Sequence, residues 1–154
     1  MGVLYIIRHA ETEYNSQEIY IGKKDVNINK IGIRQSHCLG KLLIKENLDL
    51  LVTSSLIRAK ETAYIINQYI KKDIIVDDRF VEVDIGVYEG LTSEEILEII
   101  ESRYGGDTYK FYNDHFLGGE KSKDVEERVY QGLNNIKKNY PDKRIALVTH
   151  GFII

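Results

Sequence analysis

Hydrophobic residues along this chain form short continuous runs that alternate with longer amphipathic stretches. Three of the runs are nearly uninterrupted, at residues 3–7 (VLYII), 48–54 (LDLLVTS) and 144–150 (RIALVTH). Strands that are buried on both faces of a parallel sheet have this continuous pattern, whereas half-exposed strands alternate between apolar and polar residues. The pattern therefore predicts three parallel strands.

The stretches between these runs have helical periodicity. Apolar residues recur at spacings of three and four from Leu56 to Ile70, and residues 31–46 have a similar pattern in which Gly40 is unfavourable. Thr92 and Glu95 have the spacing of a capping box, which predicts a helix that begins just after Thr92.

A further helix is predicted ahead of the last strand. Asp124 and Glu127 give a looser capping signal before an apolar stripe, and Pro141 with Asp142 predicts a turn after Tyr140. Strands that alternate with helices predict an α/β fold, a three-layer sandwich in which helices flank a mostly parallel central sheet. A length of 154 residues is that of one domain, and we expect residues 1–154 to form it.

Composition and charge narrow the classes of function. The net charge is −3 with both signs interspersed, so no basic face is indicated for nucleic acid. Cys38 is the only cysteine, which excludes an internal disulfide and a cysteine-based metal site, and we expect it to be buried in its helix. No run has the length of a signal peptide or a membrane span, so we expect a cytoplasmic protein that does not bind a membrane.

Basic side chains follow the ends of the three predicted strands. In open α/β sheets, ligands bind at the carboxyl ends of the strands. Two histidines and two arginines are therefore expected at one edge of the sheet, where they suit a small, multiply charged anion such as phosphate. The residues that follow the strands are Arg8 and His9, then Ser54, Ser55 and Arg58, then His150 and Gly151.

These residue types suit nucleophilic phosphoryl transfer. A neutral imidazole can attack phosphorus, while arginines and a second histidine stabilise charge on the transferred group. A carboxyl group with a raised pKa can protonate the departing alkoxide. Glu82, Asp84 and Glu89 are the candidates for this acid, and their spacing does not choose among them.

The same motifs, in the same order, resemble those of the histidine phosphatase superfamily, in the branch that contains cofactor-dependent phosphoglycerate mutases and related phosphatases. The resemblance spans the whole chain. The matching segments are IRHAETEYN, YIGKKDVNINKIG, LVTSSLIRAKETA, FVEVDIGVYEGLT, the rougher match GGEKSKDVEERV, and VTHG.

The resemblance implies a phosphoglycerate mutase-like fold and a role for each matching residue. His9 would be the nucleophile that becomes phosphohistidine, and Glu82 would be the proton donor. The remaining implied site residues are His150 as the second catalytic histidine, and Arg8, Asn15, Arg58 and Gly151 as substrate-binding residues. Ser54 is as consistent with helix capping as with ligand contact. No pair of histidines has metal-ligand spacing, so neither a metal nor another cofactor is expected.

Three departures from the family pattern stand out. Ala10 replaces the glycine that usually follows the first histidine, and Lys121 stands between the glutamate and the serine of the GGEKS segment. The sequence ends three residues after Gly151, so we expect it to lack the family's usual C-terminal helix and strand. Such a chain would expose apolar sheet surface.

The interval between Glu82 and His150 is short, which resembles the phosphatase relatives, including broad-specificity and α-ribazole phosphatases. The sequence therefore predicts hydrolysis of a small phosphorylated metabolite. A cofactor-dependent phosphoglycerate mutase and a non-catalytic phosphate-binding remnant are the alternatives. Residues 103–120, rich in Tyr and Gly, are expected to influence specificity, and the sequence leaves the substrate and a homo-oligomeric state open.

Overall fold

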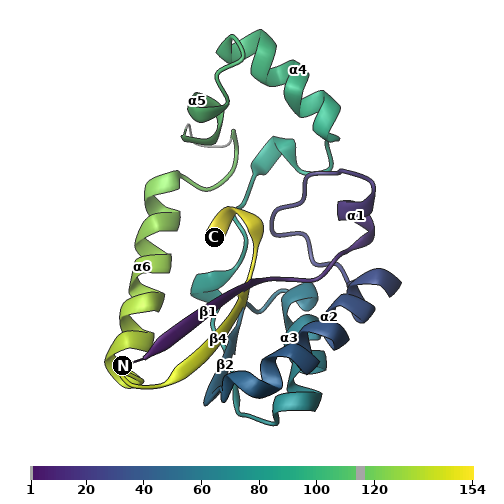
Figure 1. Ribbon diagram of the computed structural model, residues 1–154. Helices are drawn as coiled ribbons and strands as arrows, with labels where there is room; N and C mark the ends of the chain where they lie inside the picture. The colour runs from purple at the N-terminus through teal and green to yellow at the C-terminus, as the bar shows by residue number, and fades with distance from the viewer. Residues whose placement is uncertain (1, 114–116) are drawn as a thin grey trace.

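A computed structural model describes residues 2–113 and 117–154 of the chain. At its centre is a four-stranded parallel sheet in the order β1-β4-β2-β3 (Figure 1). The strands are β1 (Val3–Arg8), β2 (Leu50–Thr53), β3 (Ile74–Val76) and β4 (Arg144–Thr149). The three predicted strands are confirmed. Strand β3 was not predicted, because three apolar residues give too short a pattern.

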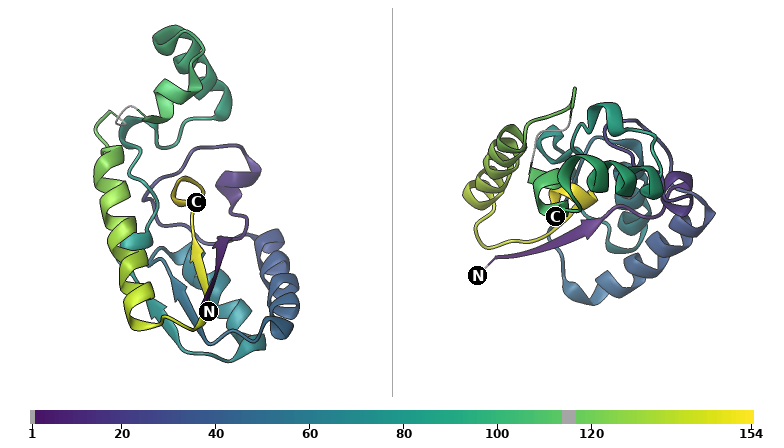
Figure 2. Two further views of the ribbon diagram at one scale, coloured as in Figure 1. Left: turned by 60° about the vertical axis from the view of Figure 1, so that its left-hand side comes forward. Right: turned by 90° about the horizontal axis from the view of Figure 1, so that it is seen from above.

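Helices cover both faces of this sheet, as Figures 1 and 2 show. Helices α2 (Lys30–Leu43) and α3 (Ile57–Ile70) lie on one face, and α6 (Ser122–Asn139) lies on the other. Successive strand residues point to opposite faces. On β2, for example, Leu51 packs with α3 whereas Leu50 and Val52 pack with Ile136 of α6. The α/β three-layer sandwich is therefore confirmed.

The remaining elements lie mainly beyond the carboxyl ends of the strands. A third apolar cluster forms where α4 (Ser93–Tyr104) and α5 (Thr108–Asn113) pack over the segment around residues 83–88. Figure 1 shows α4 and α5 above the sheet layers. The short elements are α1 (Glu13–Ser16) and the 3₁₀ turns η1 (Ile44–Glu46), η2 (Asp78–Phe80), η3 (Gly86–Tyr88) and η4 (Gly151–Ile153).

The first residues of α4 and α6 show whether the predicted helix caps are correct. Thr92 and Glu95 form the predicted capping box at the start of α4. The prediction for Asp124 is wrong, because α6 already begins at Ser122 and Lys121 occupies the N-cap position without a side-chain hydrogen bond. Within the described residues, no helix combines the length and hydrophobicity that a membrane span requires.

The packing of α2 against α3 explains why a glycine, which disfavours helices, stands at position 40. It also shows that the expectation of a buried Cys38 is wrong. A Cβ atom at Gly40 would lie 2.5 Å from the ring of Tyr69 on α3, so a glycine is needed for the close approach. Ser36 and Gly40 are buried on the inner side of α2, whereas Cys38, two residues from each, is exposed. A residue two positions away on a helix lies on a different face.

Replacing Gly40 with alanine should lower the free energy of unfolding by about 1–2 kcal/mol, because overpacking against Tyr69 outweighs the higher helix propensity of alanine. Chemical denaturation of the native protein and the variant measures the difference. In a Tyr69→Ala background the same substitution should no longer destabilise the protein. An equal loss in both backgrounds would show that the ring is not the cause.

Candidate active site

The register of β1 and β4 brings the two histidines together. Arg8, the last residue of β1, pairs with Thr149, the last residue of β4. The pairing continues for one more residue, because the His9 amide donates to the Thr149 carbonyl at 2.8 Å. His9 and His150 therefore leave neighbouring strand ends side by side, and their ring centroids are 5.2 Å apart.

His9 is held in one tautomer at the floor of a cavity. Its Nδ1 lies 2.8 Å from the carbonyl oxygen of Ala10. Since a carbonyl can only accept, Nδ1 carries the proton and Nε2 keeps its lone pair. Burial, together with the charges of Arg58 and Arg8, lowers the pKa of His9 to about 4, although the hydrogen bond to Ala10 acts in the opposite direction. The ring is therefore neutral at pH 7.

His150 lies between the ends of β1 and β2 and is fully buried. Its Nε2 is 2.7 Å from the Oγ of Ser54, the residue that follows β2. Its Nδ1 is buried without a hydrogen-bond partner among the described residues. Burial lowers the pKa of His150, and the positive charge of Arg58 lowers it further. Ser54 thus orients the second histidine, and its Oγ also accepts from the amide of Leu56 at the start of α3.

Arg58, in the first turn of α3, has no exposed surface. Its Nη1 and Nη2 donate to the carbonyl oxygens of Lys24 and Gly22, at 2.9 and 2.8 Å. Its Nε is buried without a hydrogen-bond partner among the described residues. An unpaired buried donor is uncommon in folded proteins, and here two such ring or guanidinium nitrogens, on Arg58 and His150, occur in one site. Nε of Arg58 can donate to an anion, and so can Nδ1 of His150 in the tautomer whose Nε2 accepts from the Ser54 hydroxyl.

Arg8, Gly151 and Asn15 lie along the cavity wall. The Arg8 side chain is exposed and passes close to Gly151, where an added Cβ would lie 3.5 Å from Nε of Arg8. Asn15 accepts at Oδ1 from the backbone and hydroxyl of Thr12 and so closes the first turn of α1. Asn15 therefore has a capping role that the sequence analysis did not foresee, in addition to its place at the cavity.

The three candidate acids are in different surroundings. Glu82 lines the cavity and is only 4% exposed, and burial raises its pKa against the hydrogen bonds from the amides of Val83 and Phe152. Asp84 accepts instead from the amide of Gly86, and Glu89 accepts from the amides of Gly22 and Lys24. Both are structural, and Glu89 holds the loop that binds Arg58.

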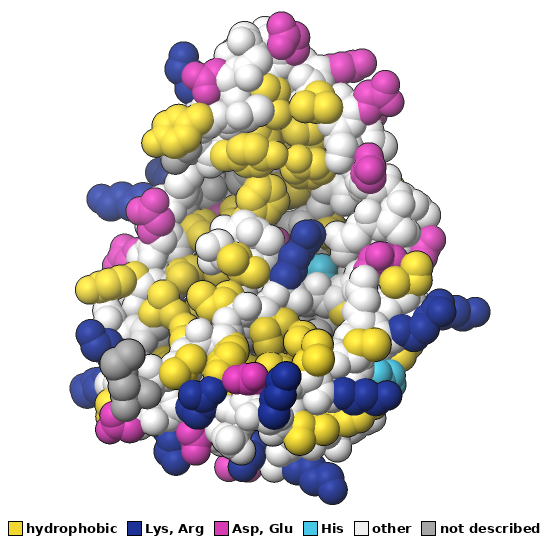
Figure 3. Space-filling view, in the orientation of Figure 1, with side chains coloured by type: hydrophobic (Ala, Val, Ile, Leu, Met, Phe, Trp, Pro, Cys, Tyr) yellow, Lys and Arg dark blue, Asp and Glu magenta, His cyan; other side chains and the backbone are white. Residues whose placement is uncertain are grey.

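The cavity has a volume of about 530 Å³ and opens beside these side chains. In the space-filling view of Figure 3, a hollow lies between the sheet layers and a group of hydrophobic side chains below α4, and histidine and basic side chains are visible in it. The cavity is lined by Arg8, His9, Asn15, Glu18, Ile19, Tyr20, Ile21, Glu82, Ser93, Gly151 and Phe152.

Several lining residues were not predicted from the sequence. Glu18, Tyr20 and Ser93 come from loops and helix ends away from the strand ends, whereas Phe152 follows β4 just after His150 and Gly151. Tyr20 is joined to α5, since its hydroxyl is 2.9 Å from that of Tyr112. Tyr112 thus connects residues 103–120 with a residue that lines the cavity, but their influence on specificity stays a prediction, and residues 114–116 lie outside the described residues.

Metal binding has no support in the described part of the chain, where no three His, Cys, Asp or Glu side chains form a group that could hold an ion. The expectation of a metal-free site stays a prediction. The site instead combines a neutral imidazole, a cluster of buried donors and a buried carboxyl group, which is an arrangement suited to an anion that is attacked by nitrogen.

Comparisons with known proteins agree with this geometry. Residues 4–154 match the family model of the histidine phosphatase superfamily (branch 1). The chain is 33% identical over 154 residues to the uncharacterized phosphatase PhoE of Bacillus subtilis, covering all of this chain and 74% of PhoE. It is 30% identical over 150 residues to phosphoserine phosphatase 1 of Hydrogenobacter thermophilus, covering 97% and 71% of the two chains.

Among solved structures, YhfR of Bacillus stearothermophilus superposes with a TM-score of 0.84 at 28% identity, over 99% of this chain and 76% of YhfR. Fold and sequence relatives therefore point to the same family, and two of them are named as phosphatases. The chain belongs to the histidine phosphatase superfamily.

Proposed function

We propose that this protein hydrolyses phosphomonoesters through a phosphohistidine intermediate formed on His9. The observation that carries the proposal is the hydrogen bond from His9 Nδ1 to the Ala10 carbonyl at 2.8 Å. It directs the unprotonated Nε2 toward attack, and the lowered pKa of about 4 keeps that nitrogen a nucleophile at neutral pH. The relatives that are named as phosphatases support the same reaction.

The phosphoryl group would be held by the buried donors around His9. Nε of Arg58 and Nδ1 of His150 each lack a partner among the described residues, so phosphate oxygens would satisfy both. Arg8, at the exposed side of the cavity, would bind a further oxygen in the open part of the site. Because these groups are fixed before the ligand arrives, they stabilise the charge of the transition state without reorganisation.

Glu82 is the proposed general acid. Burial raises its pKa, so a larger share of the carboxyl groups stays protonated and can donate to the leaving alkoxide. The same residue, once ionised, would then take a proton from the water that attacks phosphohistidine. Asp84 and Glu89 are occupied by backbone amides elsewhere and do not line the cavity.

The rest of the cavity favours hydrolysis over phosphoglycerate mutase activity. A phosphoglycerate carries a carboxylate, and a bisphosphoglycerate carries a second phosphate as well, and each of these charges would need a cationic partner. Among the described lining residues Arg8 is the only cation, and the wall beyond it consists of Glu18, Ser93 and the apolar or aromatic side chains. We therefore infer that the leaving group is neutral or carries an ammonium group.

A direct assay separates the candidate functions. We expect release of inorganic phosphate from p-nitrophenyl phosphate without added 2,3-bisphosphoglycerate, and slower release from 3-phosphoglycerate than from glycerol 3-phosphate, whose alcohol is neutral. Conversion of 3-phosphoglycerate to its isomer only after 2,3-bisphosphoglycerate is added would support the mutase alternative instead. Binding of vanadate without hydrolysis of any ester would support the non-catalytic alternative.

A further inference from the structure

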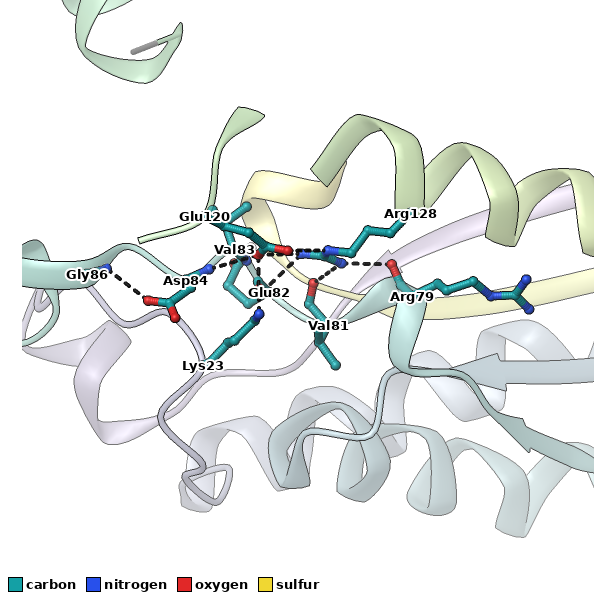
Figure 4. A network of polar contacts seen from close by, with 9 residues as sticks. All are labelled: Lys23, Arg79, Val81, Glu82, Val83, Asp84, Gly86, Glu120 and Arg128. Atoms are coloured by element: carbon teal, nitrogen blue, oxygen red, sulfur yellow. Dashed lines mark hydrogen bonds and ion pairs between the residues drawn. The ribbon is translucent and has the colours of Figure 1, made fainter. Parts of the chain in front are cut away.

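One ion pair outside the cavity joins the segment that carries the proposed acid to the loop that binds the buried arginine. Glu120, in the loop before α6, and Arg128, on α6, form a two-pronged contact with Nε–Oε1 and Nη2–Oε2 distances of 2.8 and 3.1 Å (Figure 4). Both side chains are only 17% exposed, so the pair is largely shielded from solvent. Neither residue lines the cavity.

Arg128 binds the backbone immediately before and at the proposed acid. Its Nη1 donates to the carbonyl oxygens of Arg79 and Val81, at 2.7 and 2.8 Å. Its Nη2 donates to the carbonyl oxygen of Glu82 at 3.4 Å. Figure 4 shows this guanidinium among the three carbonyl groups. One planar cation therefore fixes the path of the chain that leads to Glu82.

Glu120 holds the chain on the other side of the acid. Its Oε2 accepts from the Asp84 amide at 3.2 Å, and its own amide donates to the Asp84 carbonyl at 2.8 Å. Hydrogen bonds from Arg128 and Asp84 lower the pKa of Glu120, although burial opposes them, so the carboxylate is ionised at neutral pH. The segment that contains Glu82 is thus held before and after that residue.

The same carboxylate also reaches the loop that binds Arg58. Lys23 Nζ lies 3.4 Å from Oε2 of Glu120. Lys23 stands between Gly22 and Lys24, whose carbonyl oxygens accept from Arg58. Glu120 is therefore in contact, through one side chain, with the loop that orients the buried arginine and with the segment that orients the acid.

The Glu82 side chain itself is held by fewer contacts than the backbone around it. Its two oxygens accept only from the backbone amides of Val83 and Phe152, at 3.0 and 3.4 Å, within the described residues. The place of its carboxyl group consequently follows the backbone of residues 81–84. Removing the contacts that hold this backbone would let the carboxyl group move, and proton transfer is sensitive to small displacements.

We propose that Glu120, acting with Arg128, is a positioning residue that sets the Glu82 carboxyl against the leaving oxygen and holds it in register with the Arg58 loop. This inference rests on the proposed function. It assigns no contact with the substrate to either residue, and its effect should therefore appear in the proton-donating step rather than in attack by His9.

The test compares esters that differ in their need for an acid. The p-nitrophenolate ion leaves with little protonation, whereas an alkoxide must be protonated as it leaves. We expect Glu120→Gln to lower kcat/KM for a simple alkyl phosphate by about tenfold relative to kcat/KM for p-nitrophenyl phosphate, a part of the roughly 10²–10⁴-fold that a general acid contributes. The ratio of the two rates corrects for any fraction of unfolded protein.

A matched control removes an equivalent carboxylate far from the site. Asp49 pairs with Lys143 at 3.2 Å and accepts from the Arg144 amide at 2.8 Å, at the opposite ends of the strands. Asp49→Asn should therefore leave the ratio of rates unchanged. Lys23→Met should also leave this ratio unchanged and raise the inhibition constant of inorganic phosphate a few-fold, because it releases only the Arg58 loop.

The possible results separate a failure of the positioning role from a failure of the proposed function. If the native protein hydrolyses both esters and Glu120→Gln slows them equally, the positioning role is wrong and the proposed function stands. A ratio that changes as much in Asp49→Asn would also overturn the positioning role. A native protein that hydrolyses neither ester would overturn the proposed function together with the inference.

Discussion

Replacing His9 with alanine is expected to reduce phosphate release from p-nitrophenyl phosphate by about 10³-fold or more, because the substitution removes the nucleophile and water has no comparable position from which to attack. Arg58 and His150 lie on other segments and keep their own contacts with the loop at residues 22–24 and with Ser54. The variant should therefore still fold and still bind vanadate.

A matched histidine supplies the control for this experiment. His37, on α2, is 2.9 Å from the hydroxyl of Tyr69 and does not line the cavity. His37→Gln should keep native turnover. The native protein should also be trapped with a phosphoryl group that is lost in acid and retained in alkali, as expected for a phosphorus–nitrogen bond. Turnover of His9→Ala within a few-fold of native would rule out the mechanism.

Replacing Glu82 with glutamine should lower kcat/KM for an alkyl phosphate by roughly 10²–10⁴-fold, the usual contribution of a general acid, and lower kcat/KM for p-nitrophenyl phosphate far less, because kcat/KM does not include the later hydrolysis of phosphohistidine. Glutamine keeps the size of the side chain and, through its one oxygen, one of the two hydrogen bonds that the carboxyl oxygens accept from the Val83 and Phe152 amides, but it has no acidic proton to give. Glu82 is only 4% exposed and its pKa is raised, and for these two reasons we expect it to act as the acid.

The dependence of kcat/KM on pH gives a second test of the same substitution. The pKa of His9 is lowered to about 4, so protonation should remove the nucleophile only as the pH falls through about 4. The pKa of Glu82 is raised, so its proton is retained to higher pH and activity should fall as the pH rises through that raised value. Glu82→Gln should lose the basic limb and keep the acidic one.

The phosphate ester also titrates near pH 6, so the native and variant profiles must be compared on the same substrate. Glu98→Gln, at an exposed position on α4, is the control and should reproduce the native profile. A basic limb that persists unchanged in Glu82→Gln would mean that another group donates the proton.

Local sequence patterns predicted much of the fold correctly. The runs at residues 3–7, 48–54 and 144–150 became β1, β2 and β4, and the Thr92 capping box became the start of α4. These features depend on neighbours a few residues apart, which a single sequence displays. The short strand β3 and the real start of α6 were missed because their stability comes from the sheet and the layer that they join.

The choice among the candidate acids illustrates the other limit. Glu82, Asp84 and Glu89 are equivalent in composition and close in sequence, and only the resemblance to the family selected Glu82. The structure gives the physical difference, since Glu82 lies at the cavity whereas the other two accept from backbone amides of other segments. Ser54, which the sequence left between capping and ligand contact, contacts both His150 and the start of α3.

By itself, the sequence determined that apolar strands end on basic residues and that these residues suit an anion, because strand and helix periods and side-chain chemistry are local properties. Tertiary structure alone decided that β4 lies between β1 and β2, which places His150 beside His9 and Ser54. It also decided which nitrogens are buried without partners and which groups have shifted pKa values. Strand order and burial arise from contacts between residues far apart in the chain, and no local pattern contains them.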